Sequence, residues 1–286
     1  MRGPFCSNVS DYYLVLERES IMEEKIIPAT PYVTVIMPAY NAGQYIARSI
    51  QSVIDQTFPN WVLYAIDDGS HDDTCRIIQE FSAGDDRIIF LKNEKNIGVS
   101  ATRNKGIGLS RSKYIAFLDS DDVWHPEKLE KQLARIEQEN ADLSYCSYSL
   151  VDEHDVRIHD DYIIPAYTNY EALLKENVIG CSTVLVRTEL VKQYGFRSDY
   201  YHEDYVLWLR LLELGYVAVG CTEVLVNWRH IKNSRSADKV KSAKKRWMIY
   251  RYCVGLPLPK CVRLFLRYAF AGLRKYRRRS EKDLIC

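Results

Sequence analysis

The amino-acid sequence predicts an α/β fold in which helices flank a mostly parallel central sheet. Four short apolar runs carry this prediction, at residues 33–37, 62–66, 88–91 and 114–118, each followed by a polar turn and a helical pattern. The runs recur at intervals of roughly 25 residues, which suits helical crossovers between parallel strands. Each run also ends in polar residues, as expected at the ligand-binding edge of an open parallel sheet.

Capping residues and apolar stripes predict the helices between these strands. After the first run Asn41 can cap a helix, and after the fourth run Pro126 suits a first helical turn. Apolar residues then share one face of each helix, namely Ile46, Ile50, Val53 and Ile54 in the first and Leu129, Leu133 and Ile136 in the second. A fifth run at 143–148 extends the sheet. The later elements are a strand at 183–187, a helix at 204–214 and a strand at 224–229.

The composition is that of a soluble globular protein with a sizeable core, since 47% of the 286 residues are hydrophobic and 27% are charged. We expect a flexible lead at residues 1–30, one core domain at 31–236 and a basic helical region at 237–286. The eight cysteines are scattered without a C-x-x-C pair, which favours reduced thiols over a zinc site. No signal-peptide pattern and no stretch of about 18 uncharged apolar residues occurs, so we expect a cytoplasmic protein without a spanning helix.

The sharpest candidate site follows the run at 114–118, where Asp119, Asp121 and Asp122 place three carboxylates within four residues. A bound cation would relieve their mutual repulsion. Asp119 and Asp121 are two positions apart, so they would point to the same side of an extended chain. Oxygen ligands with no His or Cys beside them favour Mg²⁺ or Mn²⁺, which commonly bridge substrate phosphates. The alternative is a turn that caps the helix near Pro126.

Two further strand ends offer contacts to a nucleotide. Asp67, after the second run, can accept hydrogen bonds from a nucleobase imide, while Tyr40, after the first, could lie against the base ring. Gly98 would let a loop approach the nucleotide closely, and Arg103 could contact it. The alternatives are a capped turn and ordinary loop or helix residues. The chain has no G-x-G-x-x-G fingerprint and no P-loop, which counts against those two nucleotide-binding folds.

A candidate general base opens the late helix, where Glu203 and Asp204 directly follow His202. A carboxylate at this point can face the ligand edge of the sheet and accept a proton. The alternative is that the helix macrodipole alone favours acidic residues at a helix start. The residues by themselves leave both interpretations open.

Four motifs occur in a fixed order: VIMPAYN at residues 35–41, IDDGS at 66–70, NIGVSATRNKG at 96–106 and FLDSDD at 117–122. With this order and spacing the chain resembles the family 2 glycosyltransferases, which have a GT-A fold with a Rossmann-like sheet. The similarity covers about residues 33–235. The combination is more specific than any single motif, and it is typical of enzymes that build bacterial surface polysaccharide and lipopolysaccharide.

The resemblance implies a role for each matching residue. A metal ion, Mn²⁺ or Mg²⁺, would be bound by Asp121, with Asp119 beside it and facing the ribose. His230 lies in a Trp-Arg-His sequence that resembles a terminal family motif, which implies a further metal ligand. Asp204 would be the catalytic base, with Glu203 as the other member of the acidic pair. Donor contacts would come from Pro38, Ala39, Tyr40, Asn41, Asp67, Asp68, Gly98, Arg103, Asp119 and Ser120.

The resemblance also implies the reaction. An inverting glycosyltransferase would move a hexosyl or N-acetylhexosaminyl group from a UDP-sugar to a hydroxyl of a glycan or lipid-linked acceptor, in cell-surface polysaccharide biosynthesis. The chain lacks the Gln-x-x-Arg-Trp motif of processive synthases, which favours single-sugar addition. One alternative is a sugar-phosphate nucleotidyltransferase, but residues 38–41 do not form the Gly-rich, Lys-containing loop that it needs. Another is a catalytically inactive nucleotide-binding or interaction domain, against which the intact Asp119, Asp121 and Asp204 argue.

The C-terminal region is strongly basic, because residues 239–279 contain fourteen Lys or Arg residues and no Asp or Glu. Aromatic and aliphatic residues alternate with these charges, as in a basic amphipathic helix that lies on an anionic membrane. Such a region would hold the protein peripherally on the inner face of the cytoplasmic membrane, close to lipid-linked acceptors. The alternative is a helical extension that packs on the core or on a partner protein. Nucleic acid is not expected, since no recognised binding module accompanies the charge.

Overall fold

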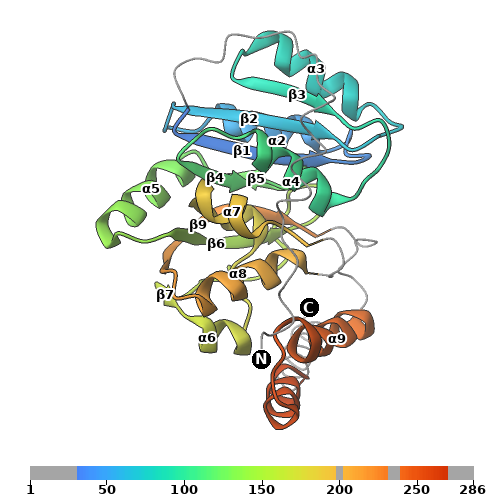
Figure 1. Ribbon diagram of the computed structural model, residues 1–286. Helices are drawn as coiled ribbons and strands as arrows, with labels where there is room; N and C mark the ends of the chain where they lie inside the picture. The colour runs from blue at the N-terminus through green and yellow to red at the C-terminus, as the bar shows by residue number, and fades with distance from the viewer. Residues whose placement is uncertain (1–30, 198–201, 231–238, 270–286) are drawn as a thin grey trace, which may run out of the picture.

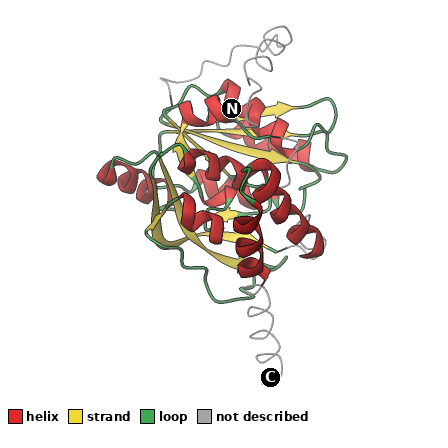
Figure 2. Ribbon diagram, turned by 60° about the horizontal axis from the view of Figure 1, so that its bottom comes forward, coloured by secondary structure: helices red, strands yellow, loops and turns green. Residues whose placement is uncertain are grey.

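The computed structural model describes residues 31–197, 202–230 and 239–269, and it has a central twisted sheet with helices against both faces (Figures 1 and 2). The strands follow the spatial order β3-β2-β1-β4-β8-β6-β9-β5, with β7 paired to β9. Their bounds are β1 (Val33–Ala39), β2 (Trp61–Asp67), β3 (Ile88–Lys92), β4 (Tyr114–Phe117), β5 (Val123–Trp124), β6 (Leu143–Val151), β7 (Tyr167–Thr168), β8 (Leu185–Arg187) and β9 (Ala218–Arg229).

The four predicted N-terminal strands form the parallel half of the sheet, which confirms that prediction. Strand β1 pairs in parallel with β2 and β4, and β2 pairs in parallel with β3. Strand β1 runs two residues further than predicted, so Pro38 and Ala39 lie inside it and are buried. The pairing between β1 and β4 ends with the bond from the amide of Leu118 to the carbonyl oxygen of Ile36. Pro38 faces β4 beyond this last bond, so the N–H that proline lacks is not needed there.

The C-terminal half of the sheet is mixed. Strand β8 lies antiparallel between β4 and β6, and β9 runs parallel to β6. The run predicted at 143–148 therefore extends the sheet as β6, but β8 separates it from β4. The strand predicted at 183–187 is shorter, because a 3₁₀ turn, η2 (Cys181–Thr183), occupies its start.

The two faces of the sheet are covered by different helices because alternate strand residues point to opposite sides. Val33, Val35 and Met37 of β1 share one core with helices on that side, whereas Ile36 belongs to the core on the other side. Helices α2 (Ile46–Ile54), α3 (Thr74–Gly84) and α5 (Lys128–Glu139) pack in the first core, and α4 (Val99–Leu109), α6 (Tyr170–Lys175), α7 (Thr188–Tyr194) and α8 (Glu203–Glu213) pack in the second.

The predicted helix starts are partly wrong. Asn41 does not cap α2, which begins at Ile46 after Tyr45. Instead Asn41 has a left-handed backbone with φ of 49° and bonds the neighbouring loop, so its side chain is not available as a cap. Pro126 lies two positions before α5, and its residues Leu129, Leu133 and Ile136 are buried as the apolar stripe predicts.

The C-terminal region is helical where it is described. Helix α9 (Lys239–Met248) continues as a π-helical turn, η3 (Ile249–Cys253), and a further helix spans residues 258–269. In Figure 1 these segments lie beside α8. The predicted flexible lead at residues 1–30 falls outside the described residues. In the described ranges, no helix combines the length and the apolar character that crossing a bilayer requires.

Candidate active site

The loops that follow β1 and β2 are joined by hydrogen bonds at the carboxyl edge of the sheet. The amide of Asn41 donates to Ser70 Oγ at 2.9 Å, and the amide of His71 donates to Asn41 Oδ1 at 2.9 Å. The left-handed backbone at Asn41 turns the chain so that both contacts form. Tyr40, just before this turn, is 46% exposed and offers an aromatic face at the sheet edge.

Asp67 is the last residue of strand β2, at the carboxyl edge of the sheet. Its side chain is fully buried, and Oδ1 accepts a 3.2 Å hydrogen bond from the amide of Ser70. Oδ2 is buried too and has no hydrogen-bond partner among the described residues. Since an unpaired buried carboxylate oxygen costs free energy, this atom is suited to accept a hydrogen bond from a ligand.

Asp68 holds the loop that precedes α4. Its Oδ1 accepts from the amide of Ile97 and its Oδ2 from the amide of Gly98, each at 2.9 Å, and Asn93 Nδ2 also donates to Oδ1. Gly98 has φ of 89°, and a Cβ added there would meet nothing within 4 Å. Asp68 therefore fixes the position of this loop, and the space next to Gly98 is open.

Arg103 on α4 binds two acidic residues of the site, Asp119 and Glu203, which lie far apart in the sequence. Its side chain is only 3% exposed; Nη2 donates to Asp119 Oδ1 at 2.5 Å, and Nη1 donates to Glu203 Oε1 at 2.9 Å. The guanidinium carbon lies 5.2 Å from the ring centroid of Phe196. A buried guanidinium reaches two carboxylates at once because its donors form a rigid fork. Arg103 thus connects the turn after β4 with the first turn of α8.

Residues 119–122 form a tight turn and are not extended. The amide of Asp122 donates to the carbonyl oxygen of Asp119 at 3.1 Å, so the argument that an extended chain aligns Asp119 with Asp121 is wrong. The proposed helix cap is wrong as well, since α5 starts later, after Glu127. The carbonyl of Ser120 accepts a 2.9 Å bond from Ser49 Oγ, which ties the turn to α2.

Asp122 anchors this turn from inside the protein. It is 1% exposed; Oδ2 accepts from Ser182 Oγ at 2.6 Å and Oδ1 from the amide of Arg229 at 2.9 Å. Burial, followed by the charges of Asp121 and Asp119, raises the pKa of Asp122 well above its usual value. A cation beside the turn would lower this electrostatic cost.

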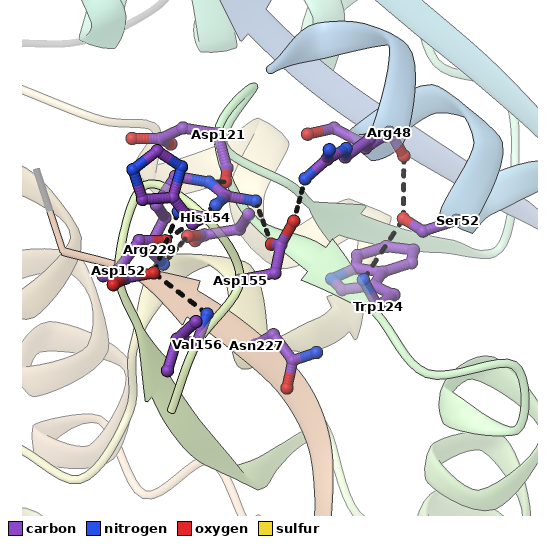
Figure 3. Close-up of polar contacts among 12 residues, drawn as sticks. Arg48, Ser52, Asp121, Trp124, Asp152, His154, Asp155, Val156, Asn227 and Arg229 are labelled. Carbon is purple, nitrogen blue, oxygen red and sulfur yellow. Dashed lines mark hydrogen bonds and ion pairs between the residues drawn. The ribbon is translucent and has the colours of Figure 1, made fainter. Parts of the chain in front are cut away.

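Arg229, at the end of β9, fixes the same turn from the other side. Its Nε donates to the carbonyl oxygen of Asp121 at 2.9 Å, and Nη1 donates to that of Asp152 at 2.8 Å. Nη2 donates to Asp155 Oδ1 at 2.5 Å, and Arg48 on α2 bonds the other oxygen of Asp155. Figure 3 shows Arg229 between Asp121 and Asp155. Arg229 is buried while Asp155 and Arg48 are partly exposed, and together these contacts hold the backbone of the turn.

His230 follows Arg229 directly. It is exposed, and its amide donates to the carbonyl oxygen of Val151 at 2.8 Å. Because Arg229 is bound to Asp121 and Asp122, His230 lies in the neighbourhood of the turn, at the end of β9.

Asp204 lies in the first turn of α8, next to Glu203 and partly buried. Burial, followed by repulsion from Glu203, raises the pKa of the Asp204 carboxyl to about 6, although the positive charge of Arg103 opposes the shift. A carboxylate with a pKa close to neutral is well suited to accept a proton during a reaction.

Comparison with known proteins identifies the chain. The sequence profile of the family Glycosyl transferase family 2 matches residues 34–195, which is more than half of the chain. The chain belongs to this family. The resemblance expected from the four motifs is thereby confirmed, and this family 2 glycosyltransferase carries the motif residues at the edge of the sheet described above.

Two relatives match this family 2 glycosyltransferase over most of their length. TuaG of Bacillus subtilis, assigned to teichuronic acid biosynthesis, is 37% identical over 86% of this chain and 97% of its own. WfgD of Escherichia coli, named as a UDP-Glc:α-D-GlcNAc-diphosphoundecaprenol β-1,3-glucosyltransferase, is 36% identical over 85% of this chain and 94% of its own.

Solved structures confirm the GT-A fold. Staphylococcus aureus TarS 1–349 in complex with UDP-GlcNAc superposes with a TM-score of 0.65 at 18% identity, over 82% of this chain and 70% of TarS 1–349. The mannosyltransferase PcManGT of Pyrobaculum calidifontis, in complex with GDP-Man and Mn²⁺, gives 0.63 at 15% identity, over 91% and 76% of the two chains. At these identities the likeness concerns the fold of this family 2 glycosyltransferase.

The turn of this family 2 glycosyltransferase fits a hard divalent cation that also binds substrate phosphates. Within residues 31–197, 202–230 and 239–269, no three His, Cys, Asp or Glu side chains converge to hold a metal ion by themselves. Mg²⁺-type ions are often bound by one or two carboxylates and completed by water and phosphate oxygens. Asp121, with Asp119 or His230 nearby, is compatible with that arrangement.

Two residues important to the site, Ser182 and Arg229, were not predicted, and Asp122 was predicted only as a member of the acidic cluster. Ser182 donates to Asp122, and its Oγ also accepts a 3.1 Å bond from the amide of Asp119. No periodicity marks it, because it belongs to the short turn η2. Asp122 lies in a recognised motif, but its burial is a tertiary property. Arg229 lies next to a predicted metal ligand, and a single Arg at a strand end gives no signal of the contacts it makes.

Proposed function

We propose that this glycosyltransferase is a metal-dependent, inverting enzyme that transfers a hexosyl or N-acetylhexosaminyl group from a UDP-sugar to a hydroxyl of a glycan or lipid-linked acceptor. Its biological role would be cell-surface polysaccharide biosynthesis. WfgD is named for its use of UDP-Glc and a diphosphoundecaprenol-linked acceptor, which supports this choice of substrates. The assignment of TuaG to teichuronic acid biosynthesis supports the biological role.

The nucleotide of the donor would bind along the carboxyl ends of β1 and β2. Asp67 Oδ2, buried and without a partner among the described residues, is an acceptor for the imide N–H of a uracil base. Tyr40 is exposed just after the end of the neighbouring strand β1 and offers a face for the base ring. The open space at Gly98 would admit the ribose or phosphates, and Asp119 would face the ribose.

The diphosphate would lie over the turn at residues 119–122. A divalent cation held by Asp121, with Asp119 and His230 as further candidates, would supply Lewis-acid stabilisation of the charge on the departing diphosphate. Arg229 and Ser182 hold the backbone and the buried anchor of this turn, so the acidic groups are positioned before the donor binds.

The acceptor hydroxyl would be activated by Asp204. Its carboxylate accepts the hydroxyl proton while the acceptor oxygen attacks the anomeric carbon from the face opposite the diphosphate, which inverts the configuration. With a pKa of about 6 the carboxylate is charged at neutral pH and is a stronger base than an ordinary Asp. Glu203 supports this group by its bond to Arg103.

The observation that carries the proposal is the bridge formed by Arg103, because it joins the donor-side Asp119 to the acidic pair that contains the candidate base. A transfer assay tests it. Purified protein is incubated with Mn²⁺, each of UDP-Glc, UDP-GlcNAc and GDP-Man, and a polyprenyl-diphosphate-linked sugar. We expect a metal-dependent, single-sugar product with one of the UDP-sugars; nucleotide release from none of the donors would instead favour a domain that only binds.

A further inference from the structure

The helix at residues 258–269 has a second apolar face that no described residue covers. Its buried face contains Cys261 and Leu264, which belong to the core. Leu258, Val262 and Leu266 are spaced four positions apart, so they form a stripe along another side of the helix. These three side chains are exposed, Leu258 to 55% and Leu266 to 63%. The stripe therefore takes little part in packing among the residues that the structure describes.

A basic face adjoins this apolar stripe. Arg263 and Arg267 are exposed on a third side of the same helix. The segment formed by residues 239–269, here called the C-terminal hairpin, contains nine Lys or Arg residues and no Asp or Glu. An exposed apolar stripe flanked by cations is typical of a helix that lies in the headgroup region of an anionic bilayer.

The C-terminal hairpin is fastened to the catalytic core. Tyr250 Oη donates to the carbonyl oxygen of Leu174 on α6 at 2.7 Å, and Lys260 Nζ bonds Glu171 Oε1 at 2.7 Å. The rings of Trp247 and Phe265 contact each other edge to face at 5.5 Å, joining the two helices of the hairpin. Its exposed stripe consequently has a defined position relative to the sheet.

The C-terminal hairpin also contacts the helix that carries the candidate base. The guanidinium of Arg246 lies 4.1 Å from the ring centroid of Tyr205, and Tyr205 directly follows Asp204 in the first turn of α8. The hairpin therefore packs near the start of α8, and Figure 1 shows α9 beside α8.

We propose that the C-terminal hairpin docks on an anionic membrane, with Leu258, Val262 and Leu266 entering the acyl boundary and Arg263 and Arg267 binding acidic headgroups. Its purpose, the presentation of a lipid-linked acceptor to Asp204, rests on the proposed function. The membrane is favoured over a second copy of the chain, because two hairpins without acidic residues would repel each other. It is favoured over nucleic acid because phosphate contacts do not use an apolar stripe.

Vesicle flotation of the full-length protein tests the docking, with vesicles of phosphatidylcholine alone or mixed with phosphatidylglycerol. We expect binding to the mixed vesicles only. Arg263→Gln with Arg267→Gln should weaken that binding by about 30-fold. Leu258→Ser with Leu266→Ser should weaken it by at least about tenfold.

Matched controls lie outside the C-terminal hairpin. Ile163→Ser removes an apolar side chain that is also 63% exposed, and Arg111→Gln removes an exposed charge; both should leave vesicle binding unchanged. Thermal unfolding shows whether each variant is folded. Retained vesicle binding in the Leu258/Leu266 variant would overturn the apolar insertion. A concentration-dependent dimer of the wild-type protein that this variant abolishes would overturn it as well.

The failure of this inference is separable from that of the proposed function. Hydrolysis of a UDP-sugar in the absence of vesicles measures the donor site alone, and we expect the hairpin variants to keep it at the wild-type rate. Vesicle binding by a protein that hydrolyses no donor would leave the docking intact and overturn the proposed function. Donor hydrolysis without vesicle binding would overturn the docking and leave the proposed function intact.

Discussion

Arg103 donates a 2.9 Å hydrogen bond to Glu203, which lies 100 positions later in the chain, at the start of α8. The same buried guanidinium bonds Asp119 at the end of β4. The contact gives the candidate base next to Glu203 a fixed place relative to the candidate donor site. Because both partners of Arg103 are acidic, the arrangement depends on the charge and on the shape of this one side chain.

Arg103→Lys keeps the charge but loses the planar fork that reaches both carboxylates. We expect kcat/KM for transfer to fall by about 10²-fold, since a displacement of about 1 Å near reacting groups has an effect of this size. Arg103→Ala should also lower the free energy of unfolding by about 2–3 kcal/mol, because it leaves the mostly buried Glu203 without a counter-charge, whereas Asp119 is 36% exposed and is partly stabilised by water. Transfer kinetics and urea denaturation measure the two effects. Wild-type kinetics in Arg103→Lys would show that the fork is not needed.

Asp204 should make stability depend on pH. Its folded-state pKa is raised from 3.8 to about 6 by burial and by Glu203. The protonated form is therefore favoured in the folded state, and this contribution is complete below about pH 4 and is lost as the pH rises through about 6. Asp204→Asn should raise the Tm near about pH 8 and change it little near about pH 4. Thermal unfolding of wild type and variant across this range checks the sign, and a Tm of Asp204→Asn below that of the wild type at the higher pH would contradict it.

Asp121→Ala tests the metal assignment. We expect Mn²⁺-dependent binding of the UDP-sugar to be lost, because in the proposed site the cation has few protein ligands besides the diphosphate. Titration calorimetry with and without Mn²⁺ measures this, with the exposed Asp55→Ala as a control for removal of a carboxylate. Equal metal-dependent affinity in Asp121→Ala and wild type would exclude Asp121 as a ligand.

Two glycines in the loops of the candidate donor site should differ in the effect of their substitution by alanine. At Gly69, with φ of 76°, a Cβ would lie 2.8 Å from the backbone of Lys95 and Asn96, so Gly69→Ala should shift the loop and destabilise the fold by more than about 2 kcal/mol. At Gly98 the strain is similar but the space is open, so Gly98→Ala should cost about 1–2 kcal/mol and mainly weaken UDP-sugar binding. Urea denaturation and titration calorimetry distinguish the two outcomes, and equal destabilisation would contradict the steric difference.

The parallel half of the fold was predictable because its strands are continuous apolar runs with polar ends, as at residues 114–118. Strands β6, β8 and β9 of the mixed half were also predicted, but their order in the sheet was not, because β8 is only Leu185–Arg187 and inserts between β4 and β6 from far along the chain. Short strands leave little periodicity, and their neighbours are set by tertiary packing.

The candidate site was likewise predictable only in part. Asp119, Arg103 and Glu203 were recognised individually from motifs, and the structure joins them through one guanidinium. The anchor role of Asp122 could not be predicted, since its partners Ser182 and Arg229 are distant in sequence and have no pattern of their own. Asn41 was misread as a cap because its capping preference is local, whereas its contact with His71 is tertiary.

The proposal that Asp204 activates the acceptor while other residues bind the donor is tested most directly with Asp204→Asn. Its turnover in the transfer assay and its UDP-sugar affinity by calorimetry are measured on the same preparation. We predict a fall in kcat of about 10²–10⁴-fold, with donor affinity within about twofold of wild type. Wild-type turnover in this variant, or loss of donor binding together with turnover, would contradict the assignment of Asp204 as the base.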